Sequence, residues 1–298
     1  MATLHLNHSE QTDAKFLIER ALAEDLGTCG DLTSLAMIPD DAEAAVNIVA
    51  RQPGVVSGVA VAKLVFEIHD KSVDFEVHIS DGGKLAAGDV VATVSGKTQS
   101  LLTGERTALN FLTHLSGVAT LTSRFAQQVV GTDATVLDTR KTLPAYRRLQ
   151  KFAVRCGGGT NHRIGLFDGI LIKDNHLAAW KESSDRVADA VRAARKYTEQ
   201  GNHDVPIEVE VDTLEQFEDA ITGEPDIVLI DNMSLDQLRQ CVAIRDKSAP
   251  KVQLEASGGV NLQTIRSIAE TGVDRISVGA LTHSAIALDL AFDWKTVL

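Results

Sequence analysis

The chain has 298 residues and a mass of 32.0 kDa, with 44% hydrophobic and 23% charged residues, enough to bury one large core or two ordinary ones. Its 29 Lys and Arg residues face 41 Asp and Glu residues, so the formal net charge is −12 and the pI about 5.2. A surface of this charge repels a polyanion, which excludes general nucleic-acid binding.

The N-terminus and the cysteines indicate a protein of the reducing cytoplasm. The first 16 residues lack a basic segment followed by an apolar one, and the most apolar later stretch, residues 54–66, is short and carries Lys63. The three cysteines are odd in number and show no C-x-x-C spacing, which argues against a disulfide framework and a zinc site. We therefore expect a soluble cytoplasmic protein with no membrane partner.

The first part of the chain mixes helices with alternating strands. Asp13 can cap a helix whose apolar residues continue to Leu26, and Gly27 provides the stop. Apolar and polar residues then alternate as in a strand with one solvated face. The pattern further along predicts two strands followed by two helices, at residues 73–79, 88–96, about 99–115 and about 117–130.

From about residue 133, short apolar runs alternate with helical segments. The clear runs are ATVLD, DGILIK, IEVEV, DIVLID, VQLEASGG and DRISVGA. Such runs suit parallel strands buried on both faces, and their later spacing of roughly 20 to 25 residues is that of one βα unit. We predict a parallel βα barrel with fewer strands than the usual eight. A doubly wound open sheet is the alternative, although no dinucleotide or Walker motif is present.

The residues that end these strands are mostly polar or glycine, and in a βα barrel this is where catalytic groups lie. They are Asp138, Lys173, Glu210, Asp231, Ser257, Gly258, Gly259 and Gly279. In IEVEVD the carboxylates of Glu208, Glu210 and Asp212 share one face, which a strand buried on both sides cannot leave in an apolar layer. We expect at least Glu210 and Asp212 to face a polar cavity with cations or metal. The alternative is an edge strand with a solvated acidic face.

Basic residues concentrate between Asp138 and Lys173. This segment has eight Lys and Arg residues against two Asp, a net charge of +6 inside a chain of −12. Such an island is expected where a ligand carries several negative charges in a small volume. We assign Arg140, Lys141, Arg163 and Lys173 to the site. At least two of the other four basic residues are expected on a solvated helix face, namely Arg147, Arg148, Lys151 and Arg155.

Glycine loops supply candidate sites for phosphate. Residues 256–260 and 277–283 follow the last two strands, where barrels of this class usually bind phosphate. The GGGTNHR segment at 157–163 also offers consecutive backbone N–H groups. Neither a nucleophilic Cys–His pair nor a helical His pair for zinc is evident. We therefore expect clamping of charge with Mg²⁺ and no covalent intermediate.

Eight motifs along the chain resemble those of the quinolinate phosphoribosyltransferase family, whose members are also called carboxylating nicotinate-nucleotide pyrophosphorylases. In order, they are GERTALNFLTHLSGVAT (104–120), DTRKT (138–142), GGGTNHR (157–163), LIKDNH (171–176), EVEVD (208–212), LIDNM (229–233), EASGG (255–259) and SVGALTHS (277–284). The resemblance runs from about residue 21 to near the C-terminus.

The resemblance implies an N-terminal α/β sandwich domain at residues 1–116 and an incomplete, TIM-like parallel βα barrel at residues 117–284, with residues 285–298 packing on the sandwich. It also implies a homodimer, or a higher oligomer, in which the sandwich of one subunit covers the barrel mouth of the other. The implied reaction joins quinolinate (pyridine-2,3-dicarboxylate) to phosphoribosyl pyrophosphate. It gives nicotinate mononucleotide, pyrophosphate and CO₂ with Mg²⁺ in de novo NAD biosynthesis.

The resemblance also implies which residues form the site. Around the carboxylates of quinolinate are Arg106 (from the neighbouring subunit), Thr139, Arg140, Lys141, His162, Arg163 and Lys173. Glu210 and Asp231 face the ribose hydroxyls and Mg²⁺, directly or through substrate or water. The 5-phosphate is bound by Ser257, Gly258, Gly259, Val278, Gly279 and Ala280. The implied catalytic residues are Lys141, Lys173, Glu210 and Asp231.

Two other functions stay open at this point. One is a phosphoribosyltransferase of the same fold acting on a monocarboxylate such as nicotinate, although the cations exceed what one carboxylate needs. The other is a non-catalytic sensor of phosphorylated metabolites. The presence of both Glu210 and Asp231 argues against a sensor.

Overall fold

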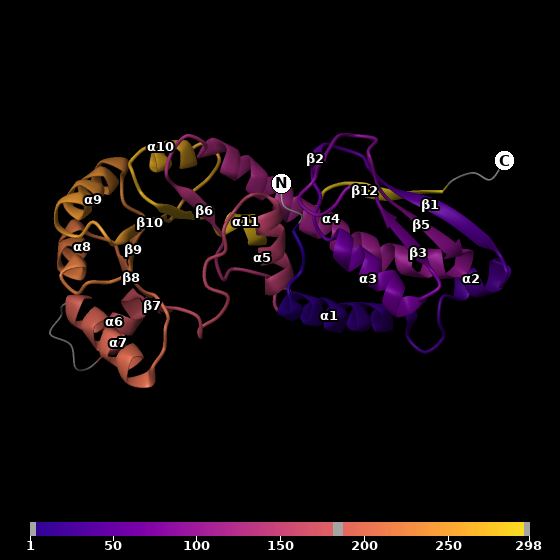
Figure 1. Cartoon of the computed structure of the whole chain (residues 1–298), viewed down its shortest axis with the longest axis horizontal. Coiled ribbons are helices and arrows are strands. Elements are labelled where there is room, and N and C mark those ends of the chain that lie inside the picture. The colour runs from indigo at the N-terminus through magenta and orange to yellow at the C-terminus, as the bar shows by residue number, and fades with distance from the viewer. Residues whose placement is uncertain (1–3, 181–186, 295–298) are drawn as a thin grey trace. The chain divides into compact units, whose positions relative to one another are not determined.

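The computed structural model describes residues 4–180 and 187–294, which divide into two compact units (Figure 1). The first unit contains the residues up to 123, residues 142–159 and those from 281 onward, and the second contains residues 124–141 and 160–280. No helix of the described residues is long and apolar enough to cross a membrane.

The first unit is built on an antiparallel sheet of four strands in the order β12-β1-β5-β3. These strands are β1 (Glu43–Ala50), β3 (Asp74–Val77), β5 (Val90–Lys97) and β12 (Leu290–Trp294). The short strands β2 (Gly54–Val55) and β4 (Lys84–Leu85) pair separately. The helices are α1 (His8–Leu26), α2 (Leu32–Met37), α3 (Val59–His69), α4 (Thr98–Gln128), α5 (Arg147–Cys156) and α11 (Ala280–His283). Because β12 pairs with β1, the C-terminal residues 290–294 complete the edge of this sheet.

The helix α4 replaces the two helices predicted at about 99–115 and 117–130, so the predicted domain boundary at residues 116 and 117 falls within one continuous helix. Gly117 marks a close approach of two backbones instead of a break. A Cβ at this position would lie 2.2 Å from the carbonyl oxygen of Ile286. A glycine in a helix therefore serves packing here.

The helix α1 begins at His8 and not near Asp13. Asn7 caps it in a capping box, in which its side chain accepts the Glu10 N–H at 2.9 Å and Glu10 accepts the Asn7 N–H at 2.8 Å. Gly27, with φ of +51°, ends the helix as predicted.

The four basic residues of α5 differ in exposure, because three are partly exposed and one is buried. Arg155 pairs with the buried Glu10 at 2.8 Å, and Arg148 pairs with Asp13 at 3.1 Å. Lys151 is fully buried. The prediction is therefore wrong for Lys151, whereas the side chains of Arg148 and Arg155 stay 31% and 29% exposed while they pair with acidic residues of α1.

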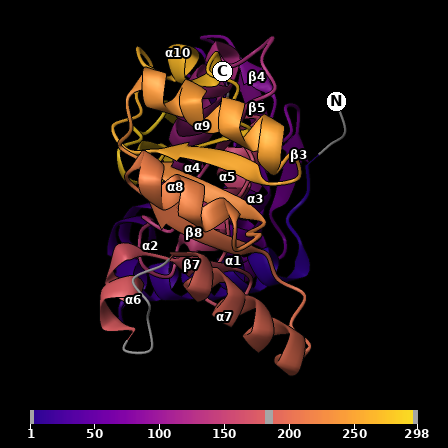
Figure 2. The same ribbon diagram turned by 90° about the vertical axis from the view of Figure 1, so that its left-hand side faces the viewer.

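The second unit is a parallel sheet of six strands in the order β6-β11-β10-β9-β8-β7. The strands are β6 (Thr135–Leu137), β7 (Ile170–Ile172), β8 (Ile207–Val211), β9 (Ile227–Asp231), β10 (Gln253–Ser257) and β11 (Arg275–Ser277). The helices are α6 (Asp174–Ala179), α7 (Val187–Gly201), α8 (Leu214–Ile221), α9 (Leu235–Ser248) and α10 (Ile265–Ala269). Figure 2 shows α7, α8 and α9 side by side on one face of the sheet.

The strands at the two ends of this sheet, β6 and β7, are not paired with each other. The curved parallel sheet with helices outside is therefore an incomplete βα barrel, which confirms the predicted fold class over the doubly wound alternative. Its C-terminal strand ends converge at one edge, where the predicted site residues lie.

Asp81 supplies the N-terminal cap that α3 lacks. Gly58 precedes this helix and has no side chain to offer, and the Asp81 carboxylate accepts the N–H groups of Gly58 at 2.6 Å, Val59 at 2.9 Å and Ala60 at 3.2 Å. Burial raises the pKa of Asp81, while the three hydrogen bonds oppose this rise. The helix start therefore depends on a residue more than 20 positions away.

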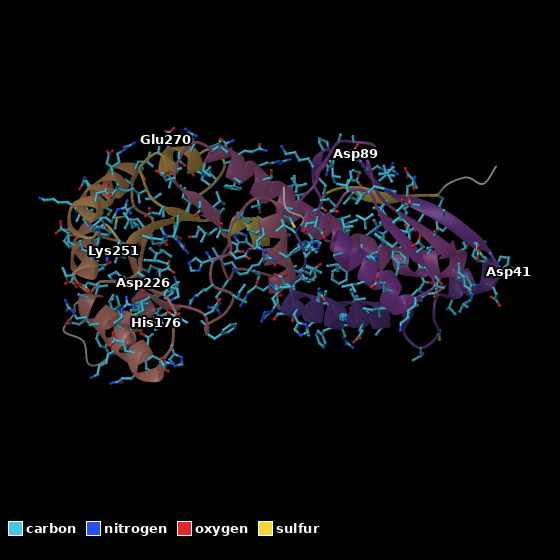
Figure 3. All side chains as sticks on the ribbon, in the orientation of Figure 1. Asp41, Asp89, His176, Asp226, Lys251 and Glu270 are labelled. Carbon is cyan, nitrogen blue, oxygen red and sulfur yellow. The ribbon has the colours of Figure 1, made fainter. Side chains whose placement is uncertain are left out.

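We expect Asp81→Ala to lower the free energy of unfolding by about 2 kcal/mol or more, because it leaves buried N–H groups without an acceptor. Asp81→Asn keeps one oxygen acceptor and should cost less. Thermal melting at neutral pH measures both, with Asp41→Ala, at an exposed position labelled in Figure 3, as the control. Equal losses for the Ala and Asn variants would contradict the capping role.

Candidate active site

A cavity of about 430 Å³ lies at the C-terminal ends of the barrel strands. It is lined by Thr139, Arg140, Lys141, His162, Arg163, Leu171, Lys173, Glu210, Leu229, Asp231, Glu255, Ser257 and Ser277. All of these residues belong to the second unit. The cavity therefore collects side chains from β7 to β11 and from the segment that follows β6.

A second hollow, of about 950 Å³, lies at the opposite ends of the same strands. Asp226 and Lys251, labelled in Figure 3, line it just before β9 and β10 begin. Catalytic groups of βα barrels lie at the C-terminal ends of the strands. The smaller cavity is therefore the candidate active site.

Most of the predicted site residues line this cavity, and the rest do not. Those that line it are Thr139, Arg140, Lys141, His162, Arg163, Lys173, Glu210, Asp231 and Ser257. Those that are not among its lining residues are Arg106, Gly258, Gly259, Val278, Gly279 and Ala280. Arg106 is exposed on α4 in the first unit. Sequence reasoning missed four lining residues, Leu171, Leu229, Glu255 and Ser277.

Two arginines, Arg140 and Arg163, line the same cavity. Burial and the positive charge of Arg140 both lower the pKa of Arg163. The Arg163 guanidinium donates to the carbonyl oxygen of Gly169 at 3.0 Å, which holds it in place. Like charges kept close together in a partly buried cavity favour a bound anion.

The two carboxylates at the ends of β8 and β9 are held differently. Glu210 forms an ion pair with Lys173. Asp231 accepts a hydrogen bond from the Asn232 side chain at 2.6 Å. The alternative role of Asp231, as a cap for α9, is not what the structure shows, because Ser234 caps this helix.

The prediction for the acidic face of β8 was correct for Glu210 and wrong for Asp212. Asp212 is exposed beyond the strand end, where its N–H donates to Gln216. Glu208 is the second carboxylate that turns inward, and it is buried. The strand alternation ends at Val211, so the third carboxylate leaves the common face.

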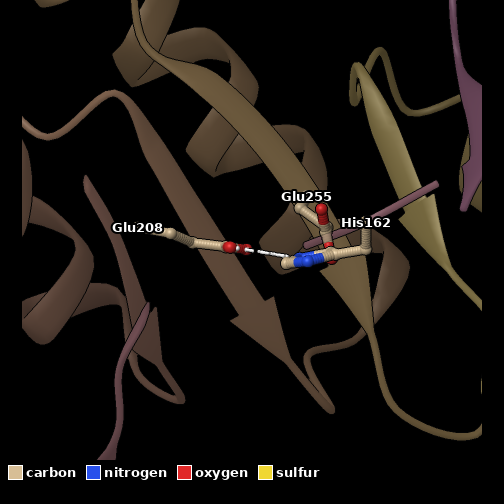
Figure 4. Close-up of side chains that lie close together, drawn as sticks. All are labelled: His162, Glu208 and Glu255. Carbon is tan, nitrogen blue, oxygen red and sulfur yellow. Dashed lines mark hydrogen bonds and ion pairs between the residues drawn. The ribbon is translucent and has the colours of Figure 1, made fainter. Parts of the chain in front are cut away.

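His162, Glu208 and Glu255 form a compact cluster at the cavity (Figure 4). The His162 Nε2 atom lies 3.1 Å from a Glu208 oxygen and 3.3 Å from a Glu255 oxygen. Arg275 contacts the other Glu255 oxygen at 2.8 Å. Groups of this kind can hold a metal ion, although direct contact between the ring and both carboxylates equally fits shared protons.

The three groups of the cluster influence one another's protonation. Burial alone lowers the pKa of His162, but the carboxylates of Glu208 and Glu255 beside its ring raise it to about 9. Burial raises the pKa of Glu208. For Glu255, burial also favours the neutral form, but His162 and Arg275 outweigh it and lower the pKa. The cluster therefore retains a proton at neutral pH.

The loop that carries His162 is fixed by Asp138, at the end of β6. The buried Asp138 carboxylate accepts the Asn161 side chain at 2.7 Å and the His162 N–H at 2.9 Å. The sequence placed Asp138 at a strand end but did not indicate this role. Asp138 shapes the wall of the cavity without lining it.

The glycine segment at 157–159 and the glycine loop after β10 differ in structure. In the GGG segment, the Gly157 and Gly158 N–H groups donate to carbonyls of α5, and a Cβ at Gly157 would lie 2.3 Å from the Ala119 carbonyl oxygen. That segment is packed and does not expose its amides for phosphate. Gly258 instead has φ of +92°, and a Cβ there would collide with Asn232. The loop after β10 runs on to Ile265, where α10 begins.

Comparison with known proteins agrees with the motifs. The family described as quinolinate phosphoribosyl transferase matches residues 31–116 by its N-terminal domain and residues 118–293 by its C-terminal domain. The carboxylating nicotinate-nucleotide pyrophosphorylase of Mycobacterium leprae (strain TN) is 44% identical over 290 residues, which cover 97% of this chain and 99% of the relative. A probable enzyme of the same name from Bacillus subtilis (strain 168) is 39% identical over 97% of this chain and 94% of its own.

Comparison of the fold with solved structures supports the same family. The structure of the nicotinate-nucleotide pyrophosphorylase from Francisella tularensis is similar to this one with a TM-score of 0.88 and 38% identity, covering 98% of this chain and 100% of that one. Both family domains, in order, therefore account for nearly the whole sequence, and the resemblance seen in the motifs is confirmed. The chain belongs to the quinolinate phosphoribosyltransferase family.

Proposed function

We propose that this chain transfers the 5-phosphoribosyl group of phosphoribosyl pyrophosphate to quinolinate with loss of CO₂, giving nicotinate mononucleotide and pyrophosphate in de novo NAD biosynthesis. The observation that carries the proposal is the presence of Arg140 and Arg163 in one cavity that also contains Glu210 and Asp231. Its relatives in M. leprae and B. subtilis bear the name of this activity.

The guanidinium pair suits a dicarboxylate. Each guanidinium can grip a carboxylate through two parallel hydrogen bonds, and quinolinate offers two adjacent carboxylates. Lys141 adds a further cation in the same cavity. Nicotinate, with one carboxylate, would leave the repulsion between Arg140 and Arg163 only partly offset, so it is the less favoured substrate.

The opposite side of the cavity suits the sugar and its phosphates. Glu210, already paired with Lys173, is placed to accept hydrogen bonds from ribose hydroxyls. Asp231 offers hard carboxylate oxygens, the ligands that Mg²⁺ prefers together with phosphate oxygens, so the residues present fit this ion. When bound there with the substrate, Mg²⁺ would supply positive charge to the pyrophosphate group. Ser257 and the loop after it would contact the 5-phosphate.

The remaining steps of the reaction depend on the orientation of the two substrates more than on a cofactor. Departure of pyrophosphate leaves positive charge on the ribose carbon, which the pyridine nitrogen attacks to form a quaternary N⁺. Loss of the 2-carboxylate as CO₂ then leaves an electron pair on C2, beside that N⁺, which stabilises it. The arginines hold the ring against the ribose, and the partly buried cavity limits water.

The test is a reaction of the purified protein with phosphoribosyl pyrophosphate and Mg²⁺, with quinolinate and nicotinate offered in parallel. We expect nicotinate mononucleotide, pyrophosphate and CO₂ in equal amounts from quinolinate. Product from nicotinate alone would favour the monocarboxylate enzyme. Binding of phosphoribosyl pyrophosphate without pyrophosphate release from either acid would favour the sensor.

Arg140→Lys retains the positive charge but loses the planar fork. We expect the KM for quinolinate to rise by roughly tenfold or more, while the affinity for phosphoribosyl pyrophosphate, measured by calorimetry, changes little. Equal weakening of both ligands would show that Arg140 does not belong to the acid subsite.

Asp231→Asn removes the charge but keeps a hydrogen-bonding side chain. Because Ser234 caps α9, the melting temperature without ligand should be nearly unchanged. Turnover should fall by at least roughly tenfold, a transition-state loss of about 1.4 kcal/mol. Near-normal turnover at limiting Mg²⁺ would rule out a role for the charge.

We further propose that the protein acts in the cytoplasm as a homodimer with shared sites, in which Arg106 reaches the cavity of the partner. Its support is the family, the exposure of Arg106 on α4, and a cavity whose own lining does not include Arg106. The described cysteines, all free, suit a reducing compartment.

Mixing inactive Arg106→Ala protein with inactive Lys173→Ala protein tests the shared site. After subunit exchange, up to about half of the molecules are heterodimers, each with one site free of both substitutions. Activity should therefore return toward roughly a quarter of the wild-type level. No recovery after exchange verified by native mass spectrometry would exclude sharing.

A further inference from the structure

An ion pair inside the barrel connects the active-site cavity with the hollow at the opposite ends of the strands. Arg275, at the start of β11, lines the hollow. Glu255, on β10, lines the active-site cavity. The Arg275 Nε atom donates to a Glu255 carboxylate oxygen at 2.8 Å. A cation that is not among the lining residues of the cavity thus contacts a residue of the cavity wall.

The register of the parallel sheet sets this contact. Glu255 lies beside Arg275 in the pairing of β10 with β11, so the two side chains leave the sheet on the same face. The Glu255 side chain is 0% exposed and that of Arg275 is 19% exposed, so water screens the pair little. A buried carboxylate without a partner is strongly unfavourable, and Glu255 therefore depends on Arg275 for compensation of its charge.

The other oxygen of Glu255 faces the ring of His162, which lines the cavity (Figure 4). This oxygen lies 3.3 Å from the His162 Nε2 atom, and an oxygen of Glu208 lies 3.1 Å from the same atom. One ring nitrogen is thus placed between two buried carboxylates. Contacts of this kind weaken steeply when their geometry changes, so the position of the ring follows from the positions of the two carboxylates.

Each of the two carboxylates also has a second cation nearby. For Glu255 this cation is Arg275. For Glu208 it is Arg163, because burial lowers the pKa of Arg163 and the charge of Glu208 acts in the opposite direction. His162 therefore does not compensate Glu255 alone. Without Arg275 it would have to, and its ring would be drawn toward Glu255 and away from Glu208.

We propose that Arg275 is a positioning residue for the acid subsite that acts through Glu255 on His162, an inference that rests on the proposed function. Arg275 holds and compensates Glu255, and Glu255 holds the ring of His162 toward the bound acid. Loss of Arg275 would displace the ring and add uncompensated negative charge to the wall that receives a dianion. Quinolinate should then bind more weakly, whereas phosphoribosyl pyrophosphate, on the opposite side of the cavity, is affected less.

The test begins with Arg275→Gln, which removes the cation. We expect the KM for quinolinate to rise by roughly fivefold or more, with kcat within about threefold of wild type and the affinity for phosphoribosyl pyrophosphate, measured by calorimetry, within about twofold. Arg275→Lys keeps the charge and should recover part of the loss. Arg195→Gln is the matched control, because Arg195 pairs with Asp226 at 3.1 Å outside the active-site cavity and should change none of these quantities.

Glu255→Gln, alone and combined with Arg275→Gln, completes a double-mutant cycle. If Arg275 acts through Glu255, its removal should change the KM for quinolinate by less than about twofold once residue 255 is Gln. Where thermal melting shows that Arg275→Gln has not folded, Arg275→Lys replaces it in both arms of the cycle.

Independent and additive increases of the KM for quinolinate would overturn the inference, and so would an unchanged KM in Arg275→Gln. A uniform loss of kcat and of affinity for both substrates would also overturn it, because a merely structural role has that effect. A wild-type protein that gives no product from quinolinate would instead refute the proposed function itself.

Discussion

The site depends on one constraint: charged side chains that are partly buried at the strand ends of the barrel need oppositely charged partners. The strands of the second unit bring carboxylates and cations to one edge of a parallel sheet, where burial penalises any charge that lacks a partner. Glu210 is matched by Lys173, and Glu255 by Arg275. Removing one member of a buried pair such as Glu255 and Arg275 typically costs about 3 to 5 kcal/mol, whereas the half-exposed Lys173 contributes less to its pair with Glu210 because water screens it.

Arg140 and Arg163 add positive charge to the same cavity. Burial lowers the pKa of Arg163 and the positive charge of Arg140 lowers it further, while the charges of Glu208 and Asp168 oppose this shift. The carboxylate pairs therefore fix the wall of the cavity, whereas the two arginines make its interior favourable for an anion.

The strand pattern was sufficient to predict the fold of the second unit and four lining residues of the cavity, Lys173, Glu210, Asp231 and Ser257. The concentration of basic residues added Arg140, Lys141 and Arg163, and the family resemblance added Thr139 and His162. Runs such as IEVEV and DIVLID are buried on both faces, and the residues that end them lie at the catalytic edge. The errors arose where two local signals compete. Asp13 and Asn7 can both cap a helix, and only the contact with Glu10 selects Asn7. The sequence predicts two helices that meet near Gly117, yet one helix continues through this residue, which marks a close backbone approach.

The contact between His162, Glu208 and Glu255 could not be predicted from the sequence. Its members come from a loop and two strands that are not adjacent in the sheet, since β9 lies between β8 and β10. No spacing along the chain encodes that contact. The residues become neighbours only because the sheet curves, which brings side chains of alternate strands together inside the barrel.

This curvature also separates two kinds of chemistry within one cavity. Groups at the very ends of strands, such as Glu210 and Asp231, belong to the polar rim, where sugar hydroxyls and phosphate charge can be met. Glu255 lies two residues before the end of β10, in a layer where it is fully buried. Burial alone would raise the pKa of Glu255, but His162 and Arg275 outweigh this effect and lower it. Depth along the strand thus separates carboxylates that can meet a substrate from a carboxylate whose charge is compensated by cations of the protein, although both kinds are glutamates and aspartates in the sequence.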